Sequence, residues 1–427
     1  MLGWEYPPFV NGGLGVASAH IARSLAAHAA LTLMVPRSPK LADALPYDLI
    51  GMQGRSLPDT WGKEMTKRQE LLREVRTRYI EVRLAGYERN PRRMEPVEEE
   101  VFLTVERHVV QDVLLRPGKT FMLDETYGPD LLERVQDFAE LVRSEAQGLD
   151  YDLIHAHDWM TFLAGLELKA ATGRPLVLHL HSLEYDRSGP GVRNWIYKLE
   201  RHAMEQADLV LAVSHYTAER IRDYYQIAPD KIKTVPNGVD PVVPYRRERP
   251  FPERLVVFLG RLEDQKGPSY FLEAARQVLA GRRDVRFVVA GKGEQIRQLI
   301  YRVAEARLGD RIHFAGHLEK EHVQDLLAMA DVYVMSSVSE PFGLSALEAA
   351  QMDVPCIVSR QSGVYEVMGG AAGVDYWDTE EMARQIGALL DDPAYRDAIR
   401  AGQRKDLQQL SWEGAASRMM DLFGTLT

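Results

Sequence analysis

Runs rich in apolar and β-branched residues alternate with amphipathic segments along most of this chain, and this alternation constrains the fold more than any other feature. The runs of strand length stand at residues 31–35, 176–182, 209–214, 255–259, 285–290 and 331–335. Parallel strands need long crossover connections, which are usually helices, so repeated strand–helix units build parallel sheets covered by helices. The sequence therefore predicts an α/β fold.

The chain is long enough for two domains. Its 427 residues exceed what one ordinary hydrophobic core organises. Asn237-Gly238 is a strong turn signal, and residues 241–252 are rich in Pro and Arg without periodicity, as in a linker. We therefore expect one domain over residues 1–240 and a second over 241–408.

Composition narrows the choice of partner and compartment. The net charge of −10 argues against nucleic acid or an anionic membrane as the main partner. Residues 67–93 are locally basic and leave membrane association open, but we favour a solvated helix face because an acidic run follows at once. The chain shows neither an apolar stretch of membrane-spanning length nor a signal-like start, so we expect a cytoplasmic protein. Cys356 is the only cysteine and is expected to be a buried, inert thiol.

The stretch from Glu340 to Gln351 carries the most specific chemistry. It follows a predicted buried strand, turns at Pro341 and Gly343, and continues as a predicted helix from Ser345. A helix that begins beside a glycine offers free N–H groups and a positive dipole end to a phosphate. The carboxylates of Glu340 and Glu348 flank this anion site. They are too far apart in the sequence for both to bind one small group. A sugar nucleotide, with hydroxyls on both sides of its phosphates, fits such a site.

Further polar loops follow other predicted strands. Arg261 and Lys266 lie in one loop that can recognise phosphate, and Gly12-Gly13 opens a helix in the first domain. Two more polar groups, His157-Asp158-Trp159 and His181 to Arg187, stand where strands of the first domain end. Ligands of open parallel sheets bind beyond the carboxyl ends of strands, so these loops are expected to line a common site.

Paired histidines raise the question of a metal. His155 and His157 share one strand face, and so do His179 and His181. No cysteine or third ligand stands at metal-binding spacing, so the sequence disfavours a metal. His155 and His179 are better interpreted as histidines packed between layers of the fold.

Taken together, Glu340-Pro341-Phe342-Gly343-Leu344 with Glu348, Gly-Arg-x4-Lys-Gly at 260–267 and the His-Asp-Trp loop resemble the retaining glycosyltransferases of families 4 and 5, and most closely glycogen synthase. The resemblance implies the GT-B architecture: two Rossmann-like domains with a cleft between them. It also implies that a last helix, within 409–427, crosses back to the first domain. The first domain would then hold the acceptor and the second the nucleotide sugar.

The resemblance also implies roles for individual residues. The residues placed at the reacting groups are His181, Arg261, Lys266 and Glu340. The donor would contact Gly12, Gly13, Gly291, His317, Leu318, Gly343, Leu344, Ser345 and Glu348. The acceptor side would comprise His157, Asp158, Trp159, Glu184 and Arg187. Synthases of this kind carry a lysine where this chain has Val10, so no catalytic lysine is expected there.

The activity implied is retaining transfer of a hexose, with glucose favoured, from a UDP- or ADP-sugar to a carbohydrate acceptor, without a cofactor or metal. A sucrose- or trehalose-type disaccharide synthase and a lipid or polysaccharide glycosyltransferase remain alternatives. A sugar-nucleotide 2-epimerase shares the two-domain fold but lacks this combination of motifs. A non-catalytic carbohydrate-binding relative is disfavoured, because every phosphate-site residue is present.

Overall fold

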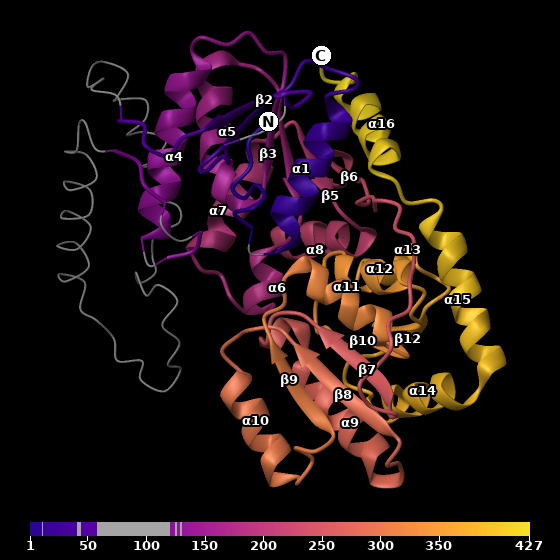
Figure 1. Ribbon diagram of the computed structural model, residues 1–427. Helices are drawn as coiled ribbons and strands as arrows, with labels where there is room; N and C mark the ends of the chain where they lie inside the picture. Colours follow the sequence, from indigo (N-terminus) through magenta and orange to yellow (C-terminus); the bar gives the residue numbers. More distant parts are fainter. Residues whose placement is uncertain (11, 41–43, 58–119, 124–125, 129) are drawn as a thin grey trace, which may run out of the picture.

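The computed structural model describes residues 1–10, 12–40, 44–57, 120–123, 126–128 and 130–427. The helix expected at 63–76, the strand expected at 80–84 and the basic stretch 67–93 lie outside these residues. Within the described part, no helix combines the length and apolar character needed to cross a membrane. Two parallel sheets with helices packed around them confirm the predicted α/β class (Figure 1).

The first sheet is wholly parallel. Its strands are β1 (Thr32–Val35), β2 (Asp48–Gly51), β3 (Ile154–His157), β4 (Leu176–Leu180), β5 (Leu209–Ala212) and β6 (Ile232–Thr234). Leu2 forms single parallel bridges to Met34 of β1 and Ala156 of β3, and so joins β1 and β2 to the other four strands. Leu2 thus occupies the position where this type of fold has its opening strand.

Helices cover the first sheet. They are α1 (Gly13–Leu25), α4 (Leu131–Ala146), α5 (Trp159–Thr172), α6 (Glu184–Ser188), α7 (Trp195–Gln206) and α8 (His215–Tyr225). Helix α5 is buried over its first ten residues because α4 and α7 pack against it as well as the sheet. Two expectations need correction: α6 stands where a loop was predicted, and Trp159 begins α5 instead of lying in the preceding loop.

The second sheet has the strand order β12-β11-β10-β7-β8-β9 and is also parallel. The strands are β7 (Arg254–Leu259), β8 (Val285–Ala290), β9 (Ile312–Gly316), β10 (Val332–Met335), β11 (Cys356–Ser359) and β12 (Ala372–Val374). The edge strand β12 was not predicted, since three residues are too few to show a period. Cys356 lies buried in β11, where burial raises the pKa of its thiol to about 12.

The helices of the second half are α9 (Pro268–Gly281), α10 (Ile296–Glu305), α11 (Lys320–Met329), α12 (Leu344–Gln351), α13 (Val364–Val367), α14 (Thr379–Asp391), α15 (Pro393–Leu407) and α16 (Trp412–Phe423). Side-chain caps fix the starts of the last three. Asp378 accepts a hydrogen bond from Glu381 N at 2.9 Å, Asp392 from Tyr395 N at 3.0 Å, and Ser411 from Gly414 N at 3.0 Å.

The final helix returns to the first sheet, as expected from the resemblance. In α16, Trp412, Ala416 and Met419 pack in one core with Ala17 and Ile21 of α1 (Figure 1). The chain therefore crosses between the two sheets twice, once in residues 235–253 and once between α15 and α16.

Candidate active site

Two loops at the carboxyl end of the second sheet lie against each other. Lys266 follows β7 and Glu340 follows β10, and Lys266 Nζ lies 2.5 Å from Glu340 Oε2. The Lys266 side chain is 22% exposed and that of Glu340 is 9% exposed, so this charge pair is largely removed from water. The main chains are joined as well, because Gln265 O accepts Val338 N at 2.8 Å. The two motifs predicted from the sequence thus form one structural unit.

Arg261 lies on the solvent side of this unit. Its guanidinium contacts Glu263 Oε2 at 2.8 Å and Gln265 Oε1 at 3.1 Å, while its side chain stays 48% exposed. Gln265 in turn donates to Ser339 O at 3.2 Å. Arg261 is therefore both oriented and accessible, as recognition of a ligand phosphate requires.

Glycines allow these loops to approach one another. Gly267 has φ +63°, and a Cβ there would stand 2.1 Å from Ser336 O. Gly291 has φ +147°, and its Cβ would meet Gly260 O at 1.8 Å. A side chain at either position would separate the loops that follow β7, β8 and β10.

The N-terminal ends of two helices face each other across the site. Gly343, at φ +102°, precedes α12, and Gly13 begins α1. A Cβ on Gly13 would lie 2.9 Å from Leu344 Cδ1, while one on Gly12 would meet nothing within 4 Å. Both helix ends direct free N–H groups and positive dipole ends toward this region. The positions predicted for donor phosphates in the two halves of the chain are thus adjacent.

Val10 packs against α1, near the helix end described above. A Cβ on Gly15 would lie 2.4 Å from Val10 Cγ1, so the valine packs against α1 instead of extending a polar group toward α12. The lysine that the resemblance would place at this position is thus replaced by an apolar side chain packed against α1.

His181 directly follows β4 and is held from two directions. Its Nε2 lies 2.9 Å from His157 Nδ1, and its backbone N–H donates to Asp158 Oδ1 at 2.7 Å. Burial lowers the pKa of the His181 imidazole to about 3, so the ring is neutral at pH 7. A neutral imidazole of fixed orientation is suited to contact a sugar hydroxyl rather than to supply charge.

Asp158 is buried in an uncommon backbone conformation, with φ +57°. Its carboxylate also accepts the Ser182 N–H at 3.3 Å and so holds the turn that follows β4. Burial raises the pKa of Asp158 to about 7, although the hydrogen bonds from His181 and Ser182 and the charge of Arg187 oppose the rise. A buried acid in a strained turn is consistent with a functional position.

This pKa predicts a specific dependence of stability on pH. An unfolded Asp titrates near 3.9, so between about pH 4 and pH 7 only the folded chain keeps the proton. The stability gained is complete below about pH 4 and is lost as pH rises through about 7. From pH 5 to pH 8, wild type should lose about 2 to 3 kcal/mol of unfolding free energy relative to Asp158→Asn. Denaturant titrations at both pH values measure the difference; equal pH dependence of the two proteins would contradict it.

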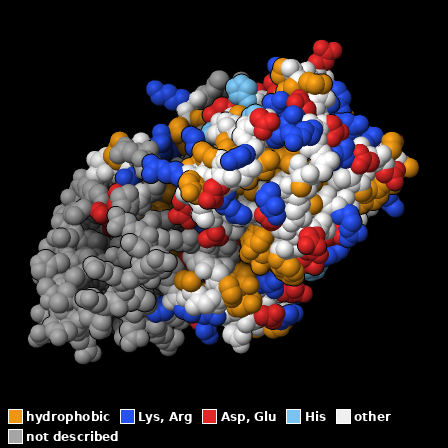
Figure 2. Space-filling view, turned by 90° about the horizontal axis from the view of Figure 1, so that it is seen from below, with side chains coloured by type: hydrophobic (Ala, Val, Ile, Leu, Met, Phe, Trp, Pro, Cys, Tyr) orange, Lys and Arg blue, Asp and Glu red, His pale blue; other side chains and the backbone are white. Residues whose placement is uncertain are grey.

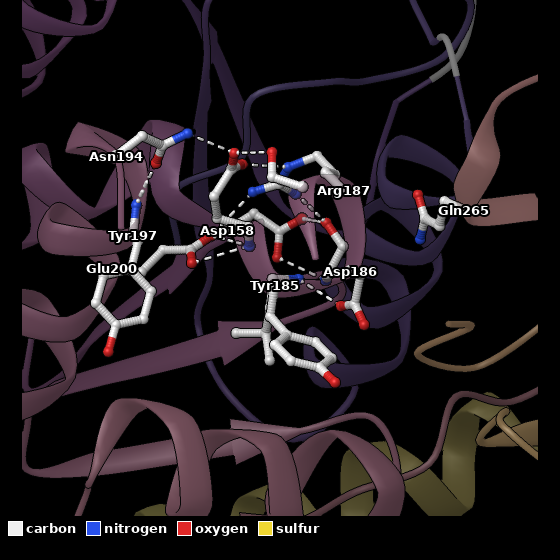
Figure 3. Close-up of polar contacts among 12 residues, drawn as sticks. Asp158, Tyr185, Asp186, Arg187, Asn194, Tyr197, Glu200 and Gln265 are labelled. Carbon is white, nitrogen blue, oxygen red and sulfur yellow. Dashed lines mark hydrogen bonds and ion pairs between the residues drawn. The ribbon is translucent and has the colours of Figure 1, made fainter. Parts of the chain in front are cut away.

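Arg187, predicted to face the acceptor, lies instead within a network of polar side chains (Figure 3). Glu184, predicted for the same role, is buried. Arg187 bridges Glu184 Oε2 and Glu200 Oε1, each at 2.9 Å. Glu200 also accepts the Glu184 N–H at 3.0 Å and the Tyr225 hydroxyl at 2.5 Å. Asn194 donates to Glu184 at 2.6 Å. The network fixes α6 against α7, so these two side chains support the site rather than line it.

Trp159 is likewise buried rather than presented to a ligand. It is 3% exposed and makes an edge-to-face contact with Trp195, with ring centroids 5.0 Å apart. The acceptor role expected for this side chain does not agree with this position, because α5 begins at Trp159 and carries the indole into the core.

Direct contacts between the two halves were not predicted. Ser339 Oγ donates to Asp186 Oδ1 at 2.5 Å and lies 3.0 Å from the Tyr216 hydroxyl. Ser214 Oγ donates to Pro341 O at 2.6 Å. Glu366 accepts the backbone N–H groups at the start of α8, from His215 at 2.8 Å and Tyr216 at 2.5 Å. The loop that holds Glu340 is therefore attached to the first sheet. Nothing in the local sequence of these residues indicates such distant partners.

The four strand histidines form one group on β3 and β4, with His157 and His179 in register. One nitrogen from each of His155, His157 and His179 lies within 4.8 Å of the others, so the reason given against a metal, the lack of a third ligand, is wrong. His155 also makes an edge contact with Phe423 of α16, as expected for a histidine packed between layers.

The remaining predicted donor residues lie at the carboxyl end of the second sheet. His317 follows β9 with a side chain 57% exposed, and Leu318 packs partly against the core. Ser345 accepts a hydrogen bond from the buried Tyr333 hydroxyl at 2.8 Å. Glu348 is exposed on α12. Their contacts with a ligand stay predictions.

Comparisons with known proteins agree on one type of enzyme. Residues 245–406 match the model of the glycosyl transferases group 1 family, and residues 69–243 that of glycosyltransferase family 4. Alpha-maltose-1-phosphate synthase of Mycolicibacterium smegmatis is 30% identical over 64% of this chain and 78% of its own. Glycogen synthase of Mycobacterium tuberculosis is 25% identical over 99% of this chain and 93% of its own. A sucrose-phosphate synthase from Thermosynechococcus elongatus has a similar structure: the TM-score is 0.70, with 20% identity, over 100% of this chain and 98% of that one.

Proposed function

The chain belongs to the GT-B glycosyltransferases of the glycogen synthase-like kind, and from this premise we propose that it transfers a hexose with retention of anomeric configuration. The donor is a nucleoside-diphosphate glucose and the acceptor a carbohydrate. The observation that carries the proposal is the contact of Lys266 with Glu340, because it places a phosphate-binding cation beside a carboxylate suited to hexose hydroxyls.

Each part of the site then has a role in the reaction. Departure of the nucleoside diphosphate concentrates negative charge on its outer phosphate. Arg261, Lys266 and the N-terminal ends of α12 and α1 stabilise this charge more strongly in the transition state than in the ground state. This positive charge comes from the protein, so the transfer requires no metal.

The sugar carbon becomes electron-deficient as its bond to the phosphate breaks. We place it near the end of β4, where neutral His181 contacts a sugar hydroxyl and nearby backbone carbonyls face the developing positive charge. The acceptor hydroxyl attacks on the face that the phosphate leaves, and the departing phosphate takes its proton. This step forms one glycosidic bond, breaks one sugar–phosphate bond and needs no covalent enzyme intermediate.

Contacts between the two halves exclude water from this reaction. The hydrogen bonds from Ser339 to Asp186 and from Ser214 to Pro341 hold the donor loops against the first sheet. A site enclosed in this way favours the acceptor over water and limits hydrolysis of the donor.

A donor-by-acceptor screen tests the proposal. UDP-glucose and ADP-glucose are each incubated with a glucan, a free sugar, a sugar phosphate or a lipid acceptor, and NMR defines the product anomer. Sugar phosphates are included because the mycolicibacterial relative is a maltose-1-phosphate synthase. We expect an α-linked product with one donor, also in the presence of a chelator. A β-linked product would refute retention, and an epimerised nucleotide sugar formed without acceptor would refute the transferase.

A further inference from the structure

A second basic site lies at the opposite end of the C-terminal sheet from the donor loops. An open hollow of about 700 Å³ is formed by the linker from residue 246 on, the start of β7, the end of α11 with the segment that joins it to β10, and one side of α15. It stands where β7 and β10 begin, whereas the donor loops follow the ends of these strands. The hollow is therefore distinct from the site described above.

Arginines dominate this surface, which we name the arginine hollow. Its walls carry six arginines but only two carboxylates, Glu248 and Asp331. Elsewhere, acidic and basic side chains are interspersed over the described surface that faces the viewer in Figure 2. The six arginines are Arg246, Arg247, Arg249, Arg254, Arg396 and Arg400.

Three of the arginines form ion pairs: Arg247 with Asp325, Arg249 with Asp331, and Arg400 with Asp397. Three others donate to backbone carbonyls. Arg246 contacts Ala330 O at 2.8 Å, Arg254 contacts Leu390 O at 3.2 Å, and Arg396 contacts Leu389 O at 3.0 Å.

These carbonyls stand at the C-terminal ends of α11 and α14. Each helix end supplies only about half a negative charge. Such contacts orient the three guanidiniums and leave most of their positive charge uncompensated.

Arg400 is the least satisfied member. Its side chain is 19% exposed, and among the described residues its buried Nε has no hydrogen-bond partner and its one ion pair, with Asp397, measures 3.5 Å. Burial lowers the pKa of Arg400; the nearby charges of Arg246 and Arg396 lower it further, while Asp353 opposes them. Capping of helix ends explains why Arg246, Arg254 and Arg396 each lie where they do. It does not account for the partly buried guanidinium of Arg400, which is held near other cations in an open hollow.

We propose that the arginine hollow binds a small, multiply charged phosphate anion. Guanidinium groups match phosphate oxygens in pairs, and Arg396 and Arg400, four residues apart on α15, face the same side. Arg246 approaches from the linker, and Arg254 from the start of β7. A bound anion would relieve the repulsion among these cations.

Such an anion would also act on the relative positions of the two sheets. The linker is one of the two chain crossings between them, and α15 leads directly into the other. A ligand that connects Arg246 to Arg400 therefore joins both crossings and favours one arrangement of the halves. Binding itself does not depend on the transfer reaction, so it can be tested whether or not the proposed function is correct.

Calorimetry with pyrophosphate tests the inference. Because the donor site also binds phosphates, titrations are done in an Arg261→Ala/Lys266→Ala background, which leaves the arginine hollow intact. We expect one site that binds pyrophosphate more tightly than inorganic phosphate. Added Arg396→Gln/Arg400→Gln should weaken it about ten-fold or more. Added Arg276→Gln, which alters an exposed arginine of α9, should leave it unchanged.

Arg246→Gln gives an independent check from the linker wall and should weaken binding similarly, with circular dichroism and thermal melting confirming that each variant is folded. The proposal is overturned if the background protein binds no pyrophosphate at millimolar concentration. It is also overturned if Arg396→Gln/Arg400→Gln and Arg246→Gln bind within two-fold of the Arg276→Gln control.

Discussion

Lys266→Ala should lower turnover by about 10²-fold or more, the loss expected when one preorganised donor to a developing negative charge is removed. Lys266 Nζ lies 2.5 Å from Glu340 Oε2, and in the proposed site it also contacts the outer phosphate of the donor. The variant removes a positive charge whose stabilising effect is greatest in the transition state. It also leaves the largely buried carboxylate of Glu340 without its ion-pair partner. Arg261→Ala should reduce turnover similarly, since this guanidinium is accessible to the same phosphates.

Steady-state kinetics with the active donor and acceptor measure the effect. Arg276→Ala serves as the matched control, because this arginine is 55% exposed on α9 and pairs only with Glu273. Its turnover should equal that of wild type. Unchanged turnover in both Lys266→Ala and Arg261→Ala would remove the proposed phosphate site. Failure of pyrophosphate to bind the arginine hollow would not contradict the proposed donor-phosphate site.

Arg187→Met should lower the unfolding free energy by about 3 to 5 kcal/mol. Arg187 is the only cation within ion-pair distance of both Glu184 and Glu200 among the described residues, and these carboxylates are 5% and 0% exposed. Methionine has a similar length but no charge, so two acidic groups would remain buried without their cation. Chemical denaturation at neutral pH measures the change.

Arg222→Met is the control for this variant. Arg222 and its partner Asp223 are both half exposed, and exposed pairs contribute about 1 kcal/mol or less. Adding Glu200→Gln to Arg187→Met should restore part of the stability, because one of the two buried acidic groups that lost their cation is removed. A loss no greater than that of Arg222→Met would show that the network in Figure 3 does not hold α6 in place.

The second half of the chain was the more predictable from sequence. Its strands and helices are short and regularly spaced, and the loops with Arg261, Lys266 and Glu340 lie close to their strands. Helix α16 lies within the range 409–427 expected for the last helix. Contacts within one strand–turn–helix unit are set by neighbours in the sequence, which is why the motifs located the site.

The first half was less predictable because the relevant partners are distant along the chain. The orientation of Glu184 depends on Glu200 and Asn194 of α7, and the position of Trp159 depends on Trp195. A polar residue after a strand indicates the correct end of the sheet, but not whether its side chain faces a ligand or a neighbouring helix. The same limit applies to Asp186, Ser214 and Glu366, whose partners belong to the other half.

The return of α16 has a consequence for synthesis of the protein. The face of α1 that includes Ala17 and Ile21 is covered by Trp412, Ala416 and Met419. While the ribosome makes the chain, this apolar face emerges nearly four hundred residues before its cover. The hydrophobic core of the nascent first domain therefore lacks α16 throughout translation of the second domain. We expect chaperones to bind this surface during that interval, and truncation before α16 to yield an aggregation-prone chain.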